Sequence, residues 1–152
     1  MNYQTALVQL PLVRETASGA PIRTPAEVER VCADMLYLAQ ESFQVLTVNT
    51  RNKLLNRHLI SIGLANASLV HPRETFRPAI LDNATGIIVV HNHPGGDPTP
   101  SADDIQITKQ LIMSGRILDI LVMDHVVLAR RDNMELPNFL SMRENGLCDF
   151  NK

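Results

Sequence analysis

Apolar residues recur along the chain in segments that alternate between helical spacing and strand-like composition. The first helical segment begins at Thr24, where a hydroxyl side chain, a proline and then Glu27 form a typical helix start. Further apolar residues continue on one helical face, at Val28, Val31, Met35, Leu38 and Ala39. The pattern therefore predicts a helix that extends from Pro25 as far as Ala39.

Strand-forming residues dominate several later segments. The segments SFQVLTVN (42–49) and LLNRHLISIG (54–63) are separated by the polar turn TRNK, which predicts neighbouring antiparallel strands. The wholly apolar run GIIVV (86–90) is typical of a central strand buried on both faces. The segment ILDILVMDHVVLAR (117–130) predicts one more strand or a closely spaced pair.

Two more segments have helical spacing. The first, HPRETFRPAILDN (71–83), starts at Pro72, and we expect Pro78 to bend or shorten the helix because proline lacks an amide proton. The second runs from Ser101 to Met113, with Gly115 as a plausible stop.

The order of these elements predicts an α/β fold with three layers, α-β-α, and a mixed sheet. A chain of 152 residues with 45% hydrophobic residues fits one globular domain. We assign residues 1–23 to an irregular N-terminal lead-in, 24–137 to the domain, and 138–152 to a polar, partly helical C-terminal tail.

Composition narrows the function classes. The net charge is -2, from 14 Lys and Arg against 16 Asp and Glu, so charge does not support DNA binding. No apolar run approaches the roughly 20 residues that span a bilayer, and the N-terminus lacks a secretory signal pattern, so we expect a cytoplasmic protein without membrane contact. Cys32 and Cys148 lie outside any CxxC spacing and are expected to be free thiols, with Cys32 buried.

The stretch HNHPGGDPTPSADD (91–104) carries the candidate chemistry. His91 and His93 are two residues apart at the end of a predicted strand, so their imidazoles point to the same side. A turn rich in Gly and Pro follows, and Asp104 lies in the first turn of the next helix, where it can face the histidines. Two imidazoles and one carboxylate leave a tetrahedral position open, which is the layout of a catalytic zinc site.

Helix capping offers a simpler explanation of part of this pattern. Ser101 and Asp104 have the spacing of a capping hydroxyl and an acidic residue three positions on, so capping alone accounts for both. A histidine at a strand end is also commonly just a half-exposed polar residue. The combination of two histidines, a rigid turn, a hydroxyl and a carboxylate nevertheless favours a metal site.

The spacing from His91 and His93 to Ser101 and Asp104 resembles the JAMM signature of JAB/MPN zinc metallo-isopeptidases. The surrounding sequence, from about Thr24 to Arg131, more closely resembles the bacterial RadC family. This resemblance implies a JAB/MPN fold, similar to the cytidine-deaminase architecture, with zinc held by His91, His93 and Asp104. Longer RadC proteins carry a helix-hairpin-helix region before this domain. We expect no such region here, which puts a DNA-binding role in doubt.

A JAMM enzyme also needs an acidic residue outside the signature, as general acid and base. Glu41 matches the family position, just ahead of a strand expected to run beside the histidine-bearing one. Glu74 is the alternative, although helix capping and the helix dipole already explain a carboxylate there. We favour Glu41. The Ser101 hydroxyl, or a nearby backbone N–H, is the candidate donor to the oxyanion.

These residues lead to one preferred function and two alternatives. The preferred function is a zinc-dependent hydrolase of peptide or isopeptide bonds, acting on a protein, peptide or conjugate. The alternatives are a DNA repair or recombination factor, and a zinc-containing binding module without catalysis, although such modules usually lack a ligand. For His125, we favour a histidine in or beside the sheet whose hydrogen bonds are made within the fold, over a residue that supports a metal ligand. The substrate and the oligomeric state stay open.

Overall fold

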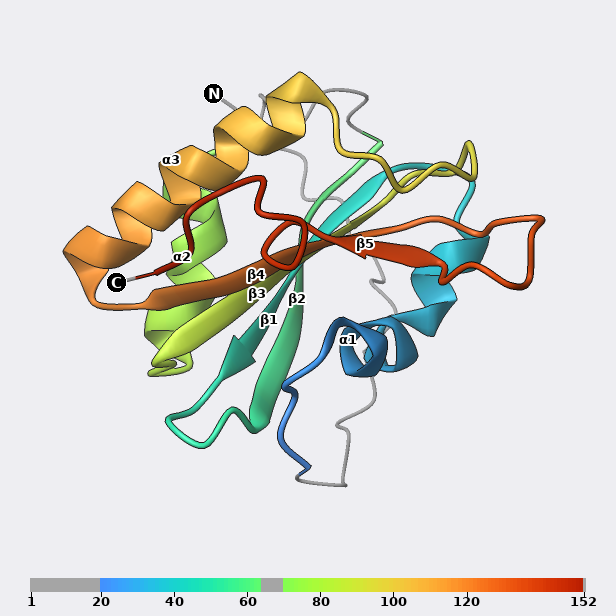
Figure 1. The fold of residues 1–152 in the computed structure, drawn as a ribbon. Coiled ribbons are helices and arrows are strands. Elements are labelled where there is room, and N and C mark those ends of the chain that lie inside the picture. The colour runs from blue at the N-terminus through green and yellow to red at the C-terminus, as the bar shows by residue number, and fades with distance from the viewer. Residues whose placement is uncertain (1–19, 64–69, 152) are drawn as a thin grey trace, which may run out of the picture.

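The computed structural model describes residues 20–63 and 70–151, so most of the predicted lead-in lies outside the described residues. Helices and strands alternate along the chain (Figure 1). In chain order they are α1 (Pro25–Val31), the 3-10 helix η1 (Ala33–Tyr37), β1 (Ser42–Val48), β2 (Leu54–Ile62), α2 (Pro72–Leu81), β3 (Gly86–Asn92), α3 (Ala102–Leu118), β4 (Leu121–Leu128) and β5 (Phe139–Ser141).

The strands form one five-stranded sheet in the order β2-β1-β3-β4-β5. The β3–β4 pair is parallel, and the other three pairs are antiparallel, which confirms the predicted mixed sheet. The hairpin predicted from residues 42–63 is the β1–β2 pair. Every residue of β3 is buried, as expected for a strand at the centre of the sheet.

Helices cover both faces of the sheet. Along β3, Ile87 and Val89 pack in a hydrophobic cluster with residues of α2 and α3, whereas Ile88 and Val90 pack in a second cluster with residues of α1. Figure 1 shows α2 and α3 on one side of the strands and α1 on the other. The α/β class predicted from the sequence is therefore correct, and β3 is buried because both of its faces carry a helical layer.

The first helix is shorter than the sequence predicted. The prediction of one helix as far as Ala39 is wrong, because α1 ends at Val31 and η1 follows from Ala33 to Tyr37. Residues three apart are eclipsed in a 3-10 helix, and the Met35 N–H donates to the Cys32 carbonyl at 2.9 Å. The tighter winding places Cys32 and Met35 together in the core, both fully buried. Burial also raises the pKa of the Cys32 thiol to about 12.

The other two helices differ from the prediction in different ways: the internal proline does not shorten α2, and α3 runs further than expected. Helix α2 continues through Pro78 to Leu81, so this proline does not shorten it. Helix α3 passes Gly115, which was the predicted stop, and ends at Leu118 with Asp119 in the left-handed conformation, φ 54°. Gly115 is buried, and a Cβ atom there would lie 2.5 Å from the Ile120 carbonyl oxygen. Position 115 is therefore a glycine because the chain after α3 packs closely against the helix there, and not because the helix ends.

We expect Gly115→Ala to lower the free energy of unfolding by about 1–3 kcal/mol, because overpacking outweighs the helix propensity of alanine. The added methyl would also meet Val122 at 3.1 Å and Phe76 at 3.3 Å. Chemical denaturation measures the change. Gln110→Ala, at an exposed position of the same helix, is the control and should alter stability by less than about 0.5 kcal/mol. Equal stability of the two variants would contradict the close approach.

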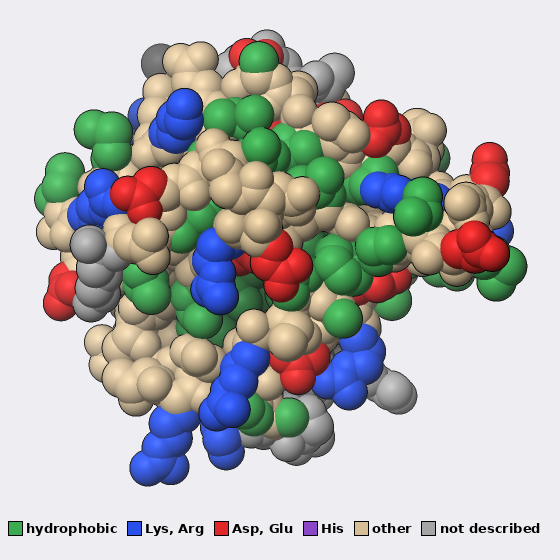
Figure 2. All heavy atoms as spheres, viewed as in Figure 1, with side chains coloured by type: hydrophobic (Ala, Val, Ile, Leu, Met, Phe, Trp, Pro, Cys, Tyr) green, Lys and Arg blue, Asp and Glu red, His purple; other side chains and the backbone are tan. Residues whose placement is uncertain are grey.

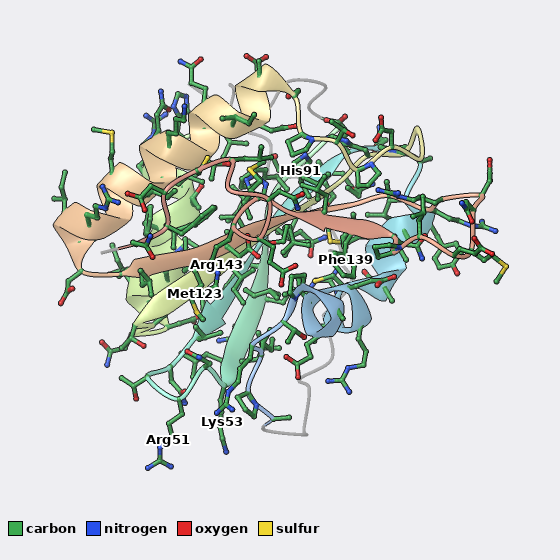
Figure 3. All side chains as sticks on the ribbon, in the orientation of Figure 1. Arg51, Lys53, His91, Met123, Phe139 and Arg143 are labelled. Carbon is green, nitrogen blue, oxygen red and sulfur yellow. The ribbon has the colours of Figure 1, made fainter. Side chains whose placement is uncertain are left out.

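The C-terminal residues pack into the domain. Residues 139–141 form β5, which pairs with β4, and the described residues from 142 to 151 contain turns but no helix, so the predicted helical character is wrong. Met142 is fully buried and Phe150 is largely buried in the cluster beneath α2 and α3. The Arg143 guanidinium donates to the Met123 carbonyl at 3.3 Å, and Figure 3 shows the two side chains close together.

A buried carboxylate fixes this C-terminal turn. Asp124 accepts hydrogen bonds from the Ser141 hydroxyl and from the Arg143 N–H. These bonds anchor the residues after β5 to β4, and the backbone there makes a turn, in which the Asn145 N–H donates to the Ser141 carbonyl at 3.2 Å, rather than a helix. Among the described helices, none is both long and apolar enough to cross a membrane.

Candidate metal centre

The two histidines lie at the end of the central strand. His91 is in β3, between Phe43 of β1 and Val127 of β4, and is buried. His93 follows directly after the strand. Because side chains alternate along a strand, both imidazoles point to the face covered by α3, and their Nε2 atoms lie 2.9 Å apart. Figure 3 shows His91 at the end of the sheet near the first turn of α3.

The turn after the strand orients the second histidine. The Asp97 carbonyl lies 2.8 Å from His93 Nδ1, so Nδ1–H donates to it and the Nε2 lone pair faces the site. Gly96 has a φ of 86°, and a Cβ atom there would lie 3.0 Å from the Arg130 carbonyl oxygen. The glycine in this turn therefore permits both the left-handed backbone and the close approach of the neighbouring segment.

The first turn of α3 supplies the carboxylate. Asp104 is buried, with its carboxylate oxygens 3.4 Å from His91 Nε2 and 3.4 Å from His93 Nε2. The capping box predicted from the sequence is also present, because the Asp104 N–H donates to Ser101 Oγ at 3.1 Å and the Ser101 N–H donates to Asp104 Oδ2 at 2.7 Å. Capping and clustering thus coexist: the cap bonds hold the carboxylate in the position that faces the histidines.

These three residues form a group that can hold a metal ion, with their candidate ligand atoms within 4.8 Å of one another. Burial acts to raise the pKa of Asp104, but the neighbouring imidazoles of His91 and His93 and the Ser101 N–H outweigh burial and hold the pKa well below its usual range. The pKa of His93 is raised, since contacts with Asp104 and Asp97 and the charge of Glu41 outweigh desolvation. Asp104 is therefore held as a carboxylate, the form that can bind a metal ion.

Two further buried groups contact the cluster. His91 Nδ1 lies 2.7 Å from His125 Nε2, and His125 Nδ1 lies 2.5 Å from Thr108 Oγ1. His125 is in β4 and both of its ring nitrogens have hydrogen-bond partners, in agreement with the favoured interpretation. One of these partners is the candidate metal ligand His91. Thr108 was missed altogether. Only its position four residues after Asp104, on the same helical face, signalled it.

Glu41 immediately precedes β1, the strand that pairs with the histidine-bearing strand β3. The Asn92 side chain, which is buried, holds the backbone on both sides of Glu41: its amide donates to the Gln40 carbonyl at 3.1 Å, and its oxygen accepts from the Ser42 N–H at 2.7 Å. Asn92 was not singled out in the sequence, although it lies between the two histidines. Its clamp ties the Glu41 segment to the histidine-bearing strand.

Glu74 has different surroundings. It lies in the first turn of α2 and pairs with Arg73 at 3.8 Å, with both side chains largely exposed. The residue before this helix, His71, makes no side-chain capping bond, so α2 has no capping box and the capping explanation for Glu74 is wrong. The favourable interaction of a carboxylate with the helix dipole still explains a glutamate at this position. Glu74 also lines an open groove between α2 and α3.

We expect Asp104→Ala to weaken zinc binding by more than about 100-fold, because it removes one of three ligands. Asp103→Ala is the matched control, since Asp103 is exposed in the same helical turn, and its zinc affinity should stay within about threefold of the unaltered protein. Competition with a chromophoric chelator measures both affinities. Equal effects would mean that the wrong carboxylate has been assigned.

The fold and the cluster together define an α/β domain with a candidate metal centre of two histidines and one carboxylate. A family comparison is more specific: residues 22–147 match the RadC-like JAB domain. The chain therefore belongs to the RadC family, and membership in the JAB domain family implies the MPN fold.

Individual relatives agree with this assignment. UPF0758 protein BH3032 of Halalkalibacterium halodurans is 43% identical over 130 residues, which cover 85% of this chain and 53% of the relative. UPF0758 protein TTE0897 of Caldanaerobacter subterraneus subsp. tengcongensis is 46% identical over 117 residues, which cover 77% of this chain and 48% of the relative. The chain thus spans about half the length of the curated relatives it matches.

Proposed function

We propose that this domain is a zinc-dependent hydrolase that cleaves peptide or isopeptide bonds in a protein, a peptide or a conjugate. The observation that carries the proposal is the convergence of His91, His93 and Asp104 at one end of the sheet, with Glu41 directly before the neighbouring strand β1. A RadC-like JAB domain supplies the matching family context.

The donor set fits zinc. Bonds of about 2.0–2.2 Å at tetrahedral angles separate neighbouring ligand atoms by roughly 3.3–3.6 Å. Asp104 Oδ1 lies 3.4 Å from His91 Nε2 and Asp104 Oδ2 lies 3.4 Å from His93 Nε2, so each separation lies in this range, and the two Nε2 atoms, at 2.9 Å, need only a small outward shift. Two nitrogens and one oxygen are also the ligand types found in catalytic zinc sites.

The residues of the chain divide the chemistry between them. Zinc, when bound, acidifies a water molecule and polarises a carbonyl oxygen. The Glu41 carboxylate would accept a proton from the water that attacks the amide carbon, and would then return that proton to the departing amine nitrogen. A single carboxylate thus transfers the proton that is released when the carbon–oxygen bond forms and required when the carbon–nitrogen bond breaks.

Ser101 is the proposed donor to the oxyanion of the substrate. Its Oγ atom accepts the Asp104 N–H, which leaves the hydroxyl proton able to donate. A donor of this kind contributes roughly 2.7–4 kcal/mol to transition-state stabilisation in other hydrolases. The capping bond restricts where the Ser101 hydroxyl lies and so orients it beside the ligand cluster.

On the face of the molecule shown in Figure 2, acidic and basic side chains are interspersed across α1 and the β5 region, whereas basic side chains gather at the lower edge, near the turn between β1 and β2 where Figure 3 labels Arg51 and Lys53. The proposal rests on the metal-binding cluster and not on this distribution of charge.

A panel of peptide and isopeptide substrates tests the proposal. We expect at least one substrate to be hydrolysed by zinc-loaded protein, with loss of turnover after chelation and recovery when zinc is restored. Failure to hydrolyse any member of the panel at full zinc occupancy would contradict the proposal and favour a zinc-containing binding module.

A further inference from the structure

A continuous chain of buried hydrogen bonds connects one candidate ligand to another. It begins at the backbone carbonyl of Asp104, passes through Thr108 and His125, and ends at the ring of His91. The side chains of Thr108 and His125 are fully buried, and His91 is 3% exposed. Water therefore does not compete for these hydrogen bonds, and each proton position depends on the next.

The proton positions follow from the first bond. The Thr108 hydroxyl lies 2.6 Å from the Asp104 carbonyl and 3.4 Å from the Met142 sulfur. A carbonyl oxygen can only accept, whereas His125 Nδ1 can either donate or accept, so the 2.6 Å contact with the carbonyl requires the Thr108 hydroxyl to donate to Asp104. The Thr108 oxygen then accepts a hydrogen bond from His125 Nδ1–H, which leaves His125 Nε2 without a proton and able to accept a hydrogen bond from His91 Nδ1–H.

We propose that Thr108 and His125 are positioning residues that hold His91 with its proton on Nδ1, so that the Nε2 lone pair is directed at the metal. The proposal rests on the proposed zinc site. A metal-binding histidine commonly donates its second ring N–H to a carboxylate or a backbone carbonyl. Here the acceptor is a second imidazole, whose own tautomer is fixed by a threonine on the helix that carries the third ligand.

Ring packing supports the same arrangement. Phe43 stacks on His91 with ring centroids 6.1 Å apart and an interplanar angle of 17°, and it meets His125 edge-on at 5.6 Å. The two imidazoles are 4.8 Å apart and inclined at 62°. Phe43 therefore restricts rotation of both rings, while Thr108 determines which nitrogen carries the proton.

Reversing the proton order shows why the direction matters. If the Thr108 hydroxyl donated to His125, then His125 Nε2 would donate to His91 Nδ1, and the neutral His91 ring would carry its proton on Nε2. That nitrogen would have no lone pair for zinc. The 2.6 Å bond from Thr108 to the Asp104 carbonyl disfavours this state.

Matched substitutions at Thr108 test the inference. Thr108→Val keeps the shape but removes the hydroxyl, and we expect it to weaken zinc binding by about 10- to 100-fold. Thr108→Ser retains the hydroxyl and should bind zinc within about threefold of the unaltered protein. Chelator competition measures both affinities, and thermal melting verifies folding. Equal zinc affinities for Thr108→Val and the unaltered protein would overturn the inference.

A measurement on the unaltered protein removes any dependence on how the variants fold. Two-bond proton–nitrogen correlation spectra of the zinc-loaded protein, with labelled imidazoles, distinguish the two neutral tautomers. We expect a proton on Nδ1 of His125, and a proton on Nε2 instead would overturn the relay. A protein that binds zinc but shows the wrong tautomer contradicts only the relay, whereas one that binds no zinc contradicts the proposed function as well.

Discussion

Replacing Glu41 with glutamine should lower hydrolysis by roughly 100-fold or more while zinc content and folding persist. Glutamine retains the size of the side chain and its capacity for hydrogen bonding, but it cannot take up the proton of the attacking water. The backbone around Glu41 is held by Asn92, so the substitution should leave this segment in place. Turnover at saturating substrate, compared at equal zinc occupancy, measures the effect.

Glu74→Gln is the control for this prediction. Glu74 lies in the exposed first turn of α2, where its loss should cost about 0.3–1 kcal/mol of stability through the helix dipole and leave turnover nearly unchanged. Loss of activity in Glu74→Gln but not in Glu41→Gln would reassign the general base. If neither substitution changed turnover, the mechanism would be wrong.

The second large effect concerns the metal. Purified protein should carry about one zinc per chain, and replacing both His91 and His93 with alanine should remove it, because a single carboxylate remains. Zinc at 100 times its dissociation constant should stabilise the unaltered protein by about 2.7 kcal/mol and raise its melting temperature. The double variant should show no such increase.

His71→Ala serves as the histidine control, since His71 is exposed before α2 and its side chain makes no capping bond. Its zinc content should equal that of the unaltered protein. Elemental analysis after gel filtration measures all three proteins. Near-stoichiometric zinc in the double variant would contradict the ligand assignment.

Local sequence patterns predicted the histidine end of the site because its geometry depends on short-range rules. Alternation along β3 places His91 and His93 on one side, and the capping pattern places Asp104 at the start of α3. These rules depend on residues within a few positions of one another. The structure accordingly brings the three candidate ligands together as the spacing predicted.

Contacts between distant segments were harder to predict. Thr108 and His125 are 17 residues apart in the sequence, and the Asn92 clamp connects segments about 50 residues apart. Their partners depend on the order of the strands, which hydrophobic periodicity does not determine. The position of Gly115 was misread for the same reason, because the group that excludes a side chain there is the Ile120 carbonyl after the chain reverses.

Diffraction from crystals of the zinc-loaded protein, recorded above and below the zinc absorption edge, tests the metal centre most directly. We predict one anomalous peak about 2.0–2.2 Å from the Nε2 atoms of His91 and His93 and from a carboxylate oxygen of Asp104. A peak at another position, or no peak between these three side chains in crystals that contain stoichiometric zinc, would contradict the assignment.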